Sequence, residues 1–242
     1  PFEFSETLEN NLDIDICVIG GGLTGISSAL NLAKKGYSIA LCEARTLGWG
    51  ASGRNGGQLG IAMRKDQFVI EKRLGFGHAK ELWKLGLEAV KETTKLISEL
   101  NIQCALQKGV IFAGFSEQNR ENFHFEIDHM QKYYNFDGYK FLDKQTINEE
   151  INTDIYNSGL LNNYNYHLNP LKLLLGLANE LVKLKVKIYE NTPVTEILND
   201  HNGIKIYSES KIIKAKKVIV GCNGYLDKLL GKIRNKFIPI NN

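Results

Sequence analysis

The chain has 242 residues, with 30 lysines and arginines against 27 aspartates and glutamates, a formal net charge of +3. This balance, without any basic arm, argues against a nucleic-acid partner. The four cysteines lie far apart and form no Cys-x-x-Cys motif. Their spacing argues against a disulfide framework or a structural metal, and it favours a reducing, cytoplasmic compartment.

The first predicted element is a buried strand over residues 14–19, an apolar run with β-branched residues. It leads into Gly20-x-Gly22-x-x-Gly25 and then into a helical pattern. In a dinucleotide-binding loop, the first glycine makes the tight turn and the second lets the backbone approach a pyrophosphate. The third lets the helix, whose N-terminus faces the phosphates, pack closely on the strand. The motif predicts a dinucleotide site, although a glycine turn between two core strands would have the same spacing.

A second predicted strand over residues 37–42 supports this interpretation, because Glu43 closes it. In dinucleotide sites an acidic residue at this distance binds a ribose hydroxyl. A glycine-dense segment follows over residues 43–58. We expect its backbone to lie against a large flat ligand, with Ser52 and Asn55 available for hydrogen bonds.

The uncharged run over residues 16–33 is long enough to cross a membrane. Its glycines, serines, threonine and asparagine favour a βα unit instead, so no membrane insertion is predicted. The residues before it are acidic, unlike the basic start of a signal peptide. The chain begins at Pro1 rather than methionine, and we expect its true N-terminus to be missing or processed.

The rest of the chain alternates predicted helices and strands, which is typical of an α/β fold. A long amphipathic helix is expected over residues 76–100. His124 and His129, on the next predicted helix, are five residues apart rather than three or four, so no metal site is predicted. Thr146-x-x-Glu149 is a candidate capping box. The other predicted elements are strands over 103–106, 109–115, 139–142, 158–163, 186–189, 194–198, 204–207, 212–213 and 218–220, and a helix over 171–184.

Several separated stretches together resemble one family. The FAD-dependent D-amino-acid-oxidase-like (DAO) superfamily has motifs similar to Ile16-Cys-Val-Ile-Gly-Gly-Gly-Leu-Thr-Gly25, Glu43 and Gly50-Ala-Ser-Gly-Arg-Asn-Gly-Gly-Gln58. Within it, the last of these motifs most resembles the gamma-glutamylputrescine oxidoreductase group. Further stretches similar to that group, in order and approximate spacing, are His167-Leu-Asn-Pro-Leu171, Pro193-Val-Thr-Glu-Ile197 and Val218-Ile-Val-Gly-Cys-Asn-Gly-Tyr225.

The resemblance implies FAD as the cofactor and assigns its contacts residue by residue. Gly20, Gly22 and Gly25 would hold the pyrophosphate, and Glu43 would bind the adenosine ribose, with Ala44 beside it. The other implied cofactor contacts are Ser52 near the phosphates, Asn55, Gly56, Gly57 and Gln58 along the isoalloxazine, Val194 at the adenine, and Cys222, Asn223 and Gly224 in a loop that returns to the cofactor.

The resemblance also implies a discontinuous Rossmann-like FAD-binding domain with an inserted α+β substrate domain. Residues 1–101 would form the first part of the FAD-binding domain and 152–225 its second part. Residues 102–151 would begin the substrate-binding domain. Residues 226–242 would cross into the remainder of that domain. Because family members are longer, we expect the chain to be truncated at its C-terminus.

The implied function is oxidation of the C–N bond of an amine or amino acid, with a gamma-glutamylputrescine-like amine favoured. A hydride would pass to the flavin, the imine would hydrolyse, and oxygen or another electron acceptor would reoxidise the flavin. Gln58 and His167 are the candidate catalytic residues, although His167 could equally be a histidine hydrogen-bonded at a helix entry. Asn169 stands where the nearest group tends to have a second histidine.

Two other functions are open on the residues alone. An NAD(P)-dependent dehydrogenase or reductase would use the same glycine motif and Glu43, but it has no need of the segment 50–58. An inactive fragment that binds a nucleotide without turnover is the second alternative, because the chain stops at Asn242.

Overall fold

The computed structural model describes residues 3, 5–201, 203–226, 229–231 and 236. The chain divides into two compact units. Unit 1 comprises Pro1–Asn55, Leu100–Cys104 and Pro170–Asn242, and unit 2 comprises Gly56–Glu99 and Ala105–Asn169. These bounds differ from the predicted domain bounds. Residues 56–99 and 152–169 fall in unit 2, and residues 102–104 fall in unit 1.

Unit 1 is built on a six-stranded sheet with the strand order β7-β2-β1-β10-β9-β8. The first four of these strands run parallel, and β9 and β8 extend the sheet antiparallel. The elements of unit 1 are β1 (Leu12–Ile19), α1 (Leu23–Ala33), β2 (Ile39–Cys42), the 3-10 helix η1 (Ala51–Gly53), α6 (Pro170–Lys183), β7 (Lys187–Tyr189), β8 (Glu196–Asp200), β9 (Gly203–Ser208), β10 (Lys211–Val220) and the 3-10 helix η2 (Asn223–Tyr225).

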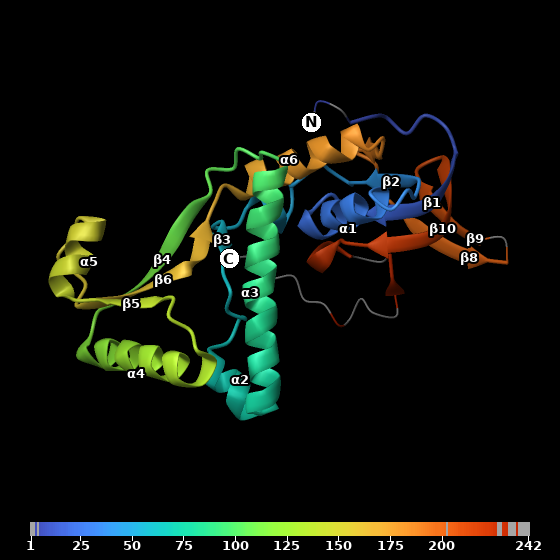
Figure 1. Ribbon diagram of the computed structural model, residues 1–242. Coiled ribbons are helices and arrows are strands. Elements are labelled where there is room, and N and C mark those ends of the chain that lie inside the picture. The colour runs from blue at the N-terminus through green and yellow to red at the C-terminus, as the bar shows by residue number, and fades with distance from the viewer. Residues whose placement is uncertain (1–2, 4, 202, 227–228, 232–235, 237–242) are drawn as a thin grey trace. The chain divides into compact units, whose positions relative to one another are not determined.

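The helix α1 carries the chain from β1 to the neighbouring parallel strand β2, as the glycine motif predicts. Its buried residues include Ile26, Ala29 and Leu30, which are three and one positions apart and so share one helical face. The helix packs along the parallel strands and against α6 (Figure 1). The β1–α1–β2 unit therefore brings the end of β1 and the end of β2 to the same edge of the sheet.

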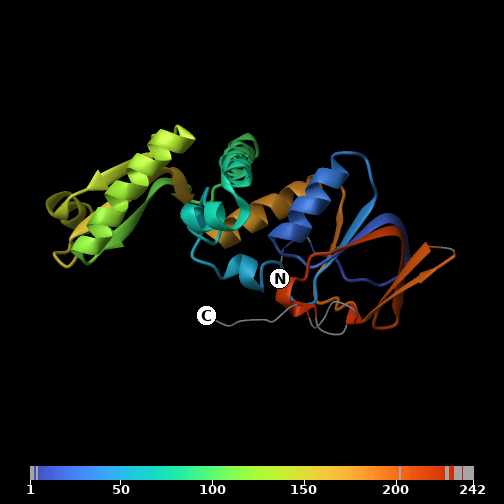
Figure 2. The same ribbon diagram turned by 90° about the horizontal axis from the view of Figure 1, so that it is seen from below.

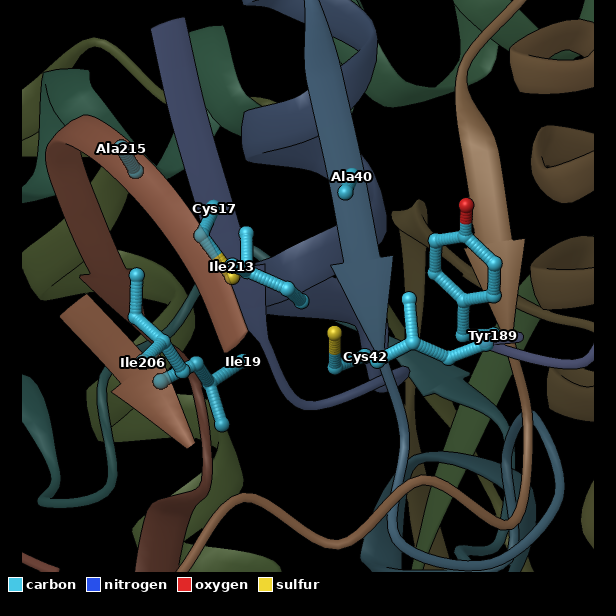
Figure 3. Packing of buried hydrophobic residues seen from close by; sticks show 9 residues of the cluster. Cys17, Ile19, Ala40, Cys42, Tyr189, Ile206, Ile213 and Ala215 are labelled. Carbon is cyan, nitrogen blue, oxygen red and sulfur yellow. The ribbon is translucent and has the colours of Figure 1, made fainter. Parts of the chain in front are cut away.

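One apolar core of unit 1 is formed by alternate residues of five strands (Figure 3). Cys17 and Ile19 lie two apart on β1, and Ala40 and Cys42 lie two apart on β2, so each pair points to the same face. Both thiols are completely buried and act as small apolar groups. A hydrogen bond with Cys42, together with burial, raises the pKa of Cys17 far above its usual range. The core also contains Tyr189, Ile206, Ile213 and Ala215.

Unit 2 is built on an antiparallel sheet in which β6 pairs with β3, β4 and β5. The helix α4 packs on this sheet (Figure 2). The core of the unit contains Ile61, Trp83 and Met130. The elements of unit 2 are β3 (Gln58–Leu59), α2 (Gln67–Leu74), α3 (Phe76–Glu99), β4 (Gln107–Gly114), α4 (Glu117–Tyr134), β5 (Tyr139–Leu142), α5 (Lys144–Ile151) and β6 (Ser158–His167).

Several predicted element bounds are wrong. The strand predicted over 103–106 does not form, and Ala105 there has a φ of +53°. The strand predicted over 109–115 is β4, which begins two residues earlier, at Gln107, and ends at Gly114. The short strands predicted over 212–213 and 218–220 are one continuous strand, β10, because its pairing with β1 runs through the lysines between them. The helix α5 is capped by Asp143, which accepts a hydrogen bond of 2.8 Å from the N–H of Thr146, so Thr146 is not the cap.

Candidate functional site

The loops that leave the carboxyl ends of β1, β2 and β10 line a pocket of about 570 Å³ in unit 1. In open parallel sheets, ligands bind at this edge, where the connections from one strand diverge to its two neighbours. The pocket is lined by residues 19–22, 42–45, 48–52, 192–195, 221–223, 225, 226 and 229.

Gly20 and Gly25 are required by the close approach of backbone to backbone. Gly20 has a φ of +106°, and a Cβ there would lie 2.7 Å from the carbonyl oxygen of Gly221, on the loop after β10. A Cβ on Gly25 would lie 1.9 Å from the carbonyl oxygen of Gly20. Larger residues would therefore push α1 away from the ends of β1 and β10.

The first turn of α1 supplies neither a capping side chain nor an acidic residue to its own N-terminus. Its N-cap residue, Gly22, has no side chain, and no acidic residue occupies the first turn. The hydroxyl of Ser52, on η1, accepts a hydrogen bond of 3.0 Å from the N–H of Leu23. The positive end of the helix dipole at Gly22 therefore borders the pocket, an arrangement that fits a diphosphate.

The carboxylate of Glu43 is fixed beside the glycine loop. One oxygen accepts a hydrogen bond of 2.6 Å from the N–H of Gly21, and the other accepts one of 2.8 Å from the N–H of Arg45. Each carboxylate oxygen has a second lone pair, so Glu43 can still accept hydrogen bonds from ligand hydroxyls. This position and remaining capacity fit the two hydroxyls of a ribose.

The segment after β7 forms another part of the pocket wall, through residues 192–195. The N–H of Thr192 donates to the carbonyl of Glu43, and the N–H of Asn191 donates to the carbonyl of Arg45, both at 2.8 Å. The buried carboxylate of Glu190 accepts a hydrogen bond of 2.6 Å from the N–H of Leu47. These bonds fix the wall to the loop that follows β2.

Most of the predicted cofactor residues of unit 1 line this pocket: Gly20, Gly22, Glu43, Ala44, Ser52, Val194, Cys222 and Asn223. Gly25, Asn55 and Gly224 are not among the lining residues. Gly25 instead packs the helix on the strand, and the Asn55 amide donates to the carbonyls of Ala51 and Ser52, within its own segment.

Cys222 lines the pocket, and its thiol donates a hydrogen bond of 3.5 Å to the carbonyl oxygen of Ile19. Burial, and then the negative charge of Glu43, raise the pKa of Cys222 to about 11. The thiol is therefore protonated at neutral pH and is a weak nucleophile.

Sequence reasoning missed several lining residues, among them Arg45, Trp49, Thr192 and Tyr225. Of these four residues, only Trp49 could have been found from the sequence, because a large aromatic side chain inside a glycine-dense segment needs other side chains to pack against. The structure supplies three: the guanidinium groups of Arg45 and Arg54 and the ring of Tyr225. Thr192 and Tyr225 are remote in sequence, and only the strand order brings them to the pocket.

The two predicted catalytic residues belong to unit 2, where the fold brings them together. Gln58 on β3 and His167 on β6 are directly paired across the antiparallel ladder, so their side chains share a face. Both residues are exposed. The pairing continues through the N–H of Leu168, which donates to the carbonyl of Gly57 at 3.0 Å, and Gly56 leaves room for the Gln58 amide beside it.

Within the described residues, no group of three or more His, Cys, Asp and Glu side chains is arranged to hold a metal ion. A search of the same residues finds no helix that is both long and apolar enough to span a membrane.

Comparisons with known proteins agree with this geometry. The model of the DAO family, described as FAD dependent oxidoreductase, matches residues 15–241. The gamma-glutamylputrescine oxidoreductase of Escherichia coli is 32% identical over 99% of this chain and 55% of its own length. A probable oxidoreductase, OrdL, of Haemophilus influenzae is 31% identical over 94% of this chain and 54% of its own length. The chain thus spans just over half the length of these relatives.

A solved structure supports the fold. The crystal structure of glycine oxidase from Geobacillus kaustophilus matches with a TM-score of 0.77 and 20% identity, over 92% of this chain and 59% of that one. The chain therefore belongs to the DAO family of FAD-dependent oxidoreductases. This confirms the predicted family, the mixed α/β fold and FAD as the family's cofactor, and it opposes the nicotinamide-dependent alternative.

Proposed function

We propose that this chain is part of a flavoprotein that oxidises the C–N bond of a small amine or amino acid. The observation that carries the proposal is the convergence, in one pocket of unit 1, of the N-terminus of α1, which has no acidic residue in its first turn, and the carboxylate of Glu43. The helix end suits a diphosphate and the carboxylate suits a ribose, so the pocket has the two main recognition elements for a dinucleotide.

We assign FAD binding to unit 1 and substrate binding to unit 2. When bound, FAD supplies the acceptor for the hydride. The loop around Gly20 and the hydroxyl of Ser52 would hold the diphosphate, and Glu43 would hold the adenosine ribose. Val194 would contact the adenine, and Cys222 and Asn223 would close the pocket from the β10 side.

In unit 2, Gln58 and His167 would act on the substrate amine. A neutral imidazole can take a proton from an ammonium group, which leaves the unprotonated amine that C–H oxidation needs. The amide oxygen of Gln58 can accept a hydrogen bond from the same amine and orient it. Their direct cross-strand pairing supports a shared task, because both exposed side chains lie on one face of the ladder.

A gamma-glutamylputrescine-like amine is the favoured substrate. Support comes from the Escherichia coli relative of that name, which is 32% identical over 99% of this chain. Oxygen or another electron acceptor would complete the turnover. Among the described residues no disulfide joins Cys17, Cys42, Cys104 or Cys222, which supports the proposed reducing, cytoplasmic location.

The test is anaerobic reduction of the FAD-loaded chain by gamma-glutamylputrescine, putrescine or glycine, followed as loss of flavin absorbance. Loss with gamma-glutamylputrescine alone would support the proposed substrate, and loss with glycine alone would replace it with an amino acid. Retained FAD that no substrate reduces would favour a nucleotide-binding fragment without turnover. Admitting air afterwards tests oxygen as the acceptor.

His167→Ala should slow this reduction more at pH 7 than at pH 9. At the lower pH the amine is largely protonated and needs the imidazole as base, whereas at the higher pH more of it is already neutral. Asn169→Ala, in the loop that follows β6, is the matched control and should leave the rate nearly unchanged. An equal slowing by His167→Ala at both pH values would contradict the proposal that His167 acts as the base.

A further inference from the structure

A cluster of stacked cationic and aromatic side chains borders the pocket of unit 1. The Cζ of Arg45 lies 5.6 Å and that of Arg54 lies 5.0 Å from the centroid of the Trp49 ring. The Tyr225 ring meets Trp49 edge-on, with centroids 5.8 Å apart and planes at 65°. We call these four residues the Trp49 cluster. The Arg54 guanidinium is also tied down, because its Nε donates to the carbonyl of Trp49.

The two arginines of the Trp49 cluster differ in one respect. Arg45 lines the pocket, and Arg54 does not. Among the described lining residues, Arg45 carries the only positive side chain and Glu43 the only negative one. Trp49 and Tyr225 also line the pocket, and they remain 42% and 56% exposed.

The negative charge of a dinucleotide ligand calls for a positively charged side chain in the pocket, and Arg45 can provide it. The diphosphate of a dinucleotide carries two negative charges, whereas a helix N-terminus is equivalent to only about +0.5 elementary charge. A guanidinium can supply the rest without risk of deprotonation, and stacking on an indole fixes its plane at little entropic cost. Neither the glycine loop nor Ser52 provides a full positive charge.

We propose that Arg45, positioned by Trp49, is the residue that recognises the diphosphate charge of the dinucleotide. This inference rests on the proposed function, because it takes FAD as the ligand of the pocket. Arg54 stacks on the same indole but lies outside the pocket lining, and we assign it no part in binding. The pocket thus distinguishes a charged dinucleotide from an uncharged nucleoside through a side chain outside the glycine motif.

The test is the Kd of the full chain for FAD, measured by equilibrium dialysis at low and high salt. Arg45→Gln should raise the Kd about tenfold at low salt, and the Kd should then depend less on salt than in the wild type. Trp49→Leu should raise it about threefold, because the charge remains but loses its stacking. Arg54→Gln, the matched control, should stay within about twofold of the wild type.

A second ligand separates charge recognition from a general change in the pocket. ADP, which carries a diphosphate, should compete with FAD about tenfold less well in Arg45→Gln, whereas competition by adenosine should not change. Arg45→Lys should recover part of the ADP affinity. Far-UV circular dichroism and the unfolding midpoint verify that each variant folds.

The outcomes separate this inference from the proposed function. If the wild type binds FAD and Arg45→Gln binds it with the same Kd and the same salt dependence, this inference is overturned and the proposed function is not. An equal loss in Arg54→Gln would also overturn it, because the effect would then be one of general surface charge. A wild-type chain that binds neither FAD nor ADP would overturn the proposed function and this inference together.

Discussion

The carboxylate of Glu43 accepts a hydrogen bond of 2.6 Å from the N–H of Gly21, which ties the end of β2 to the loop that follows β1. The second oxygen of the same carboxylate accepts from the N–H of Arg45. One side chain therefore fixes the glycine loop and the residue that we assign to the diphosphate, and it retains lone pairs for ribose hydroxyls. Organisation of the pocket and recognition of the ligand are thus combined in Glu43.

Replacing Glu43 should affect stability and FAD affinity together. Glu43→Ala leaves two backbone N–H groups without their acceptor, and we expect a loss of about 1–3 kcal/mol in the free energy of unfolding. The Kd for FAD should rise at least about tenfold, because charged hydrogen bonds to the ribose are lost. Urea unfolding and equilibrium dialysis measure the two effects. Glu196→Ala, an exposed residue of β8, is the control and should change neither.

Two glycine substitutions should separate crowding from backbone strain. Gly20 and Gly36 have φ angles of +106° and +86°, but a Cβ would clash with Gly221 only at Gly20, since nothing lies within 4 Å of Gly36. Gly36→Ala should therefore cost about 1 kcal/mol of unfolding free energy, from strain alone. Gly20→Ala should cost about 2–4 kcal/mol and abolish FAD retention. Equal costs in thermal or urea unfolding would refute the close approach of the Gly20 and Gly221 backbones.

The ion pair of Asp15 with Lys216 should make stability depend on pH in acid. A hydrogen bond of 2.8 Å from Lys216, and then bonds from Ser38, hold the pKa of Asp15 well below its usual range. A depressed pKa stabilises the fold above the unfolded value, about 3.9, and this contribution is lost as the pH falls further.

Asp15→Asn should therefore be less stable than the wild type at pH 7, and the difference should shrink below about pH 4. Unfolding midpoints in urea at several pH values measure it. Asp13→Asn removes the same charge from an exposed position on the same strand and should have a smaller effect at pH 7. A difference for Asp15→Asn that grows in acid would show that the pair is not formed.

In unit 2, Tyr134 should contribute more to stability than its neighbour Tyr133. Its hydroxyl donates to Glu71 at 2.7 Å and accepts from the Gln67 amide at 2.9 Å, and His129 meets the same Glu71 oxygen at 2.9 Å. Tyr134→Phe removes a partner from both neighbours and should cost about 1–3 kcal/mol of unfolding free energy.

Tyr133→Phe, an exposed control on the same helix, should cost less than about 0.5 kcal/mol. Burial raises the pKa of Tyr134 to about 12, so its contribution is complete below about pH 10 and is lost as the pH rises through the higher value. The two variants should therefore differ by the same amount at pH 6 and pH 9. Similar stabilities of the two variants in urea would contradict the network.

The β1–α1–β2 unit could be predicted because its signals are local. The glycines and Glu43 follow one another within a single βαβ unit, and each has a separate steric or charge requirement. The helix α2 gave no such signal, since only Gln67 and Ile70 are buried in it. The sequence predicts two short strands in place of β10, because lysines interrupt its apolar pattern, whereas its pairing with β1 is continuous.

Only the residues of the site that belong to local sequence motifs could be predicted. Pairing of Gln58 with His167 depends on an antiparallel ladder between segments that are far apart in sequence, and no local pattern indicates it. Thr192 and Tyr225 reach the pocket through the strand order β7-β2-β1-β10. Arg45 was missed for a different reason: a surface arginine is common, and only its stacking on Trp49 beside the pocket distinguishes it.

The most direct test of the central claim is the visible absorbance spectrum of the purified chain after incubation with FAD and desalting. We predict a retained flavin spectrum in the wild type and its loss in Gly20→Ala, with Gly36→Ala as the folded control. Glu43→Ala should retain less FAD than the wild type. A wild-type chain that is folded by circular dichroism and keeps no flavin would contradict the assignment of this pocket to FAD.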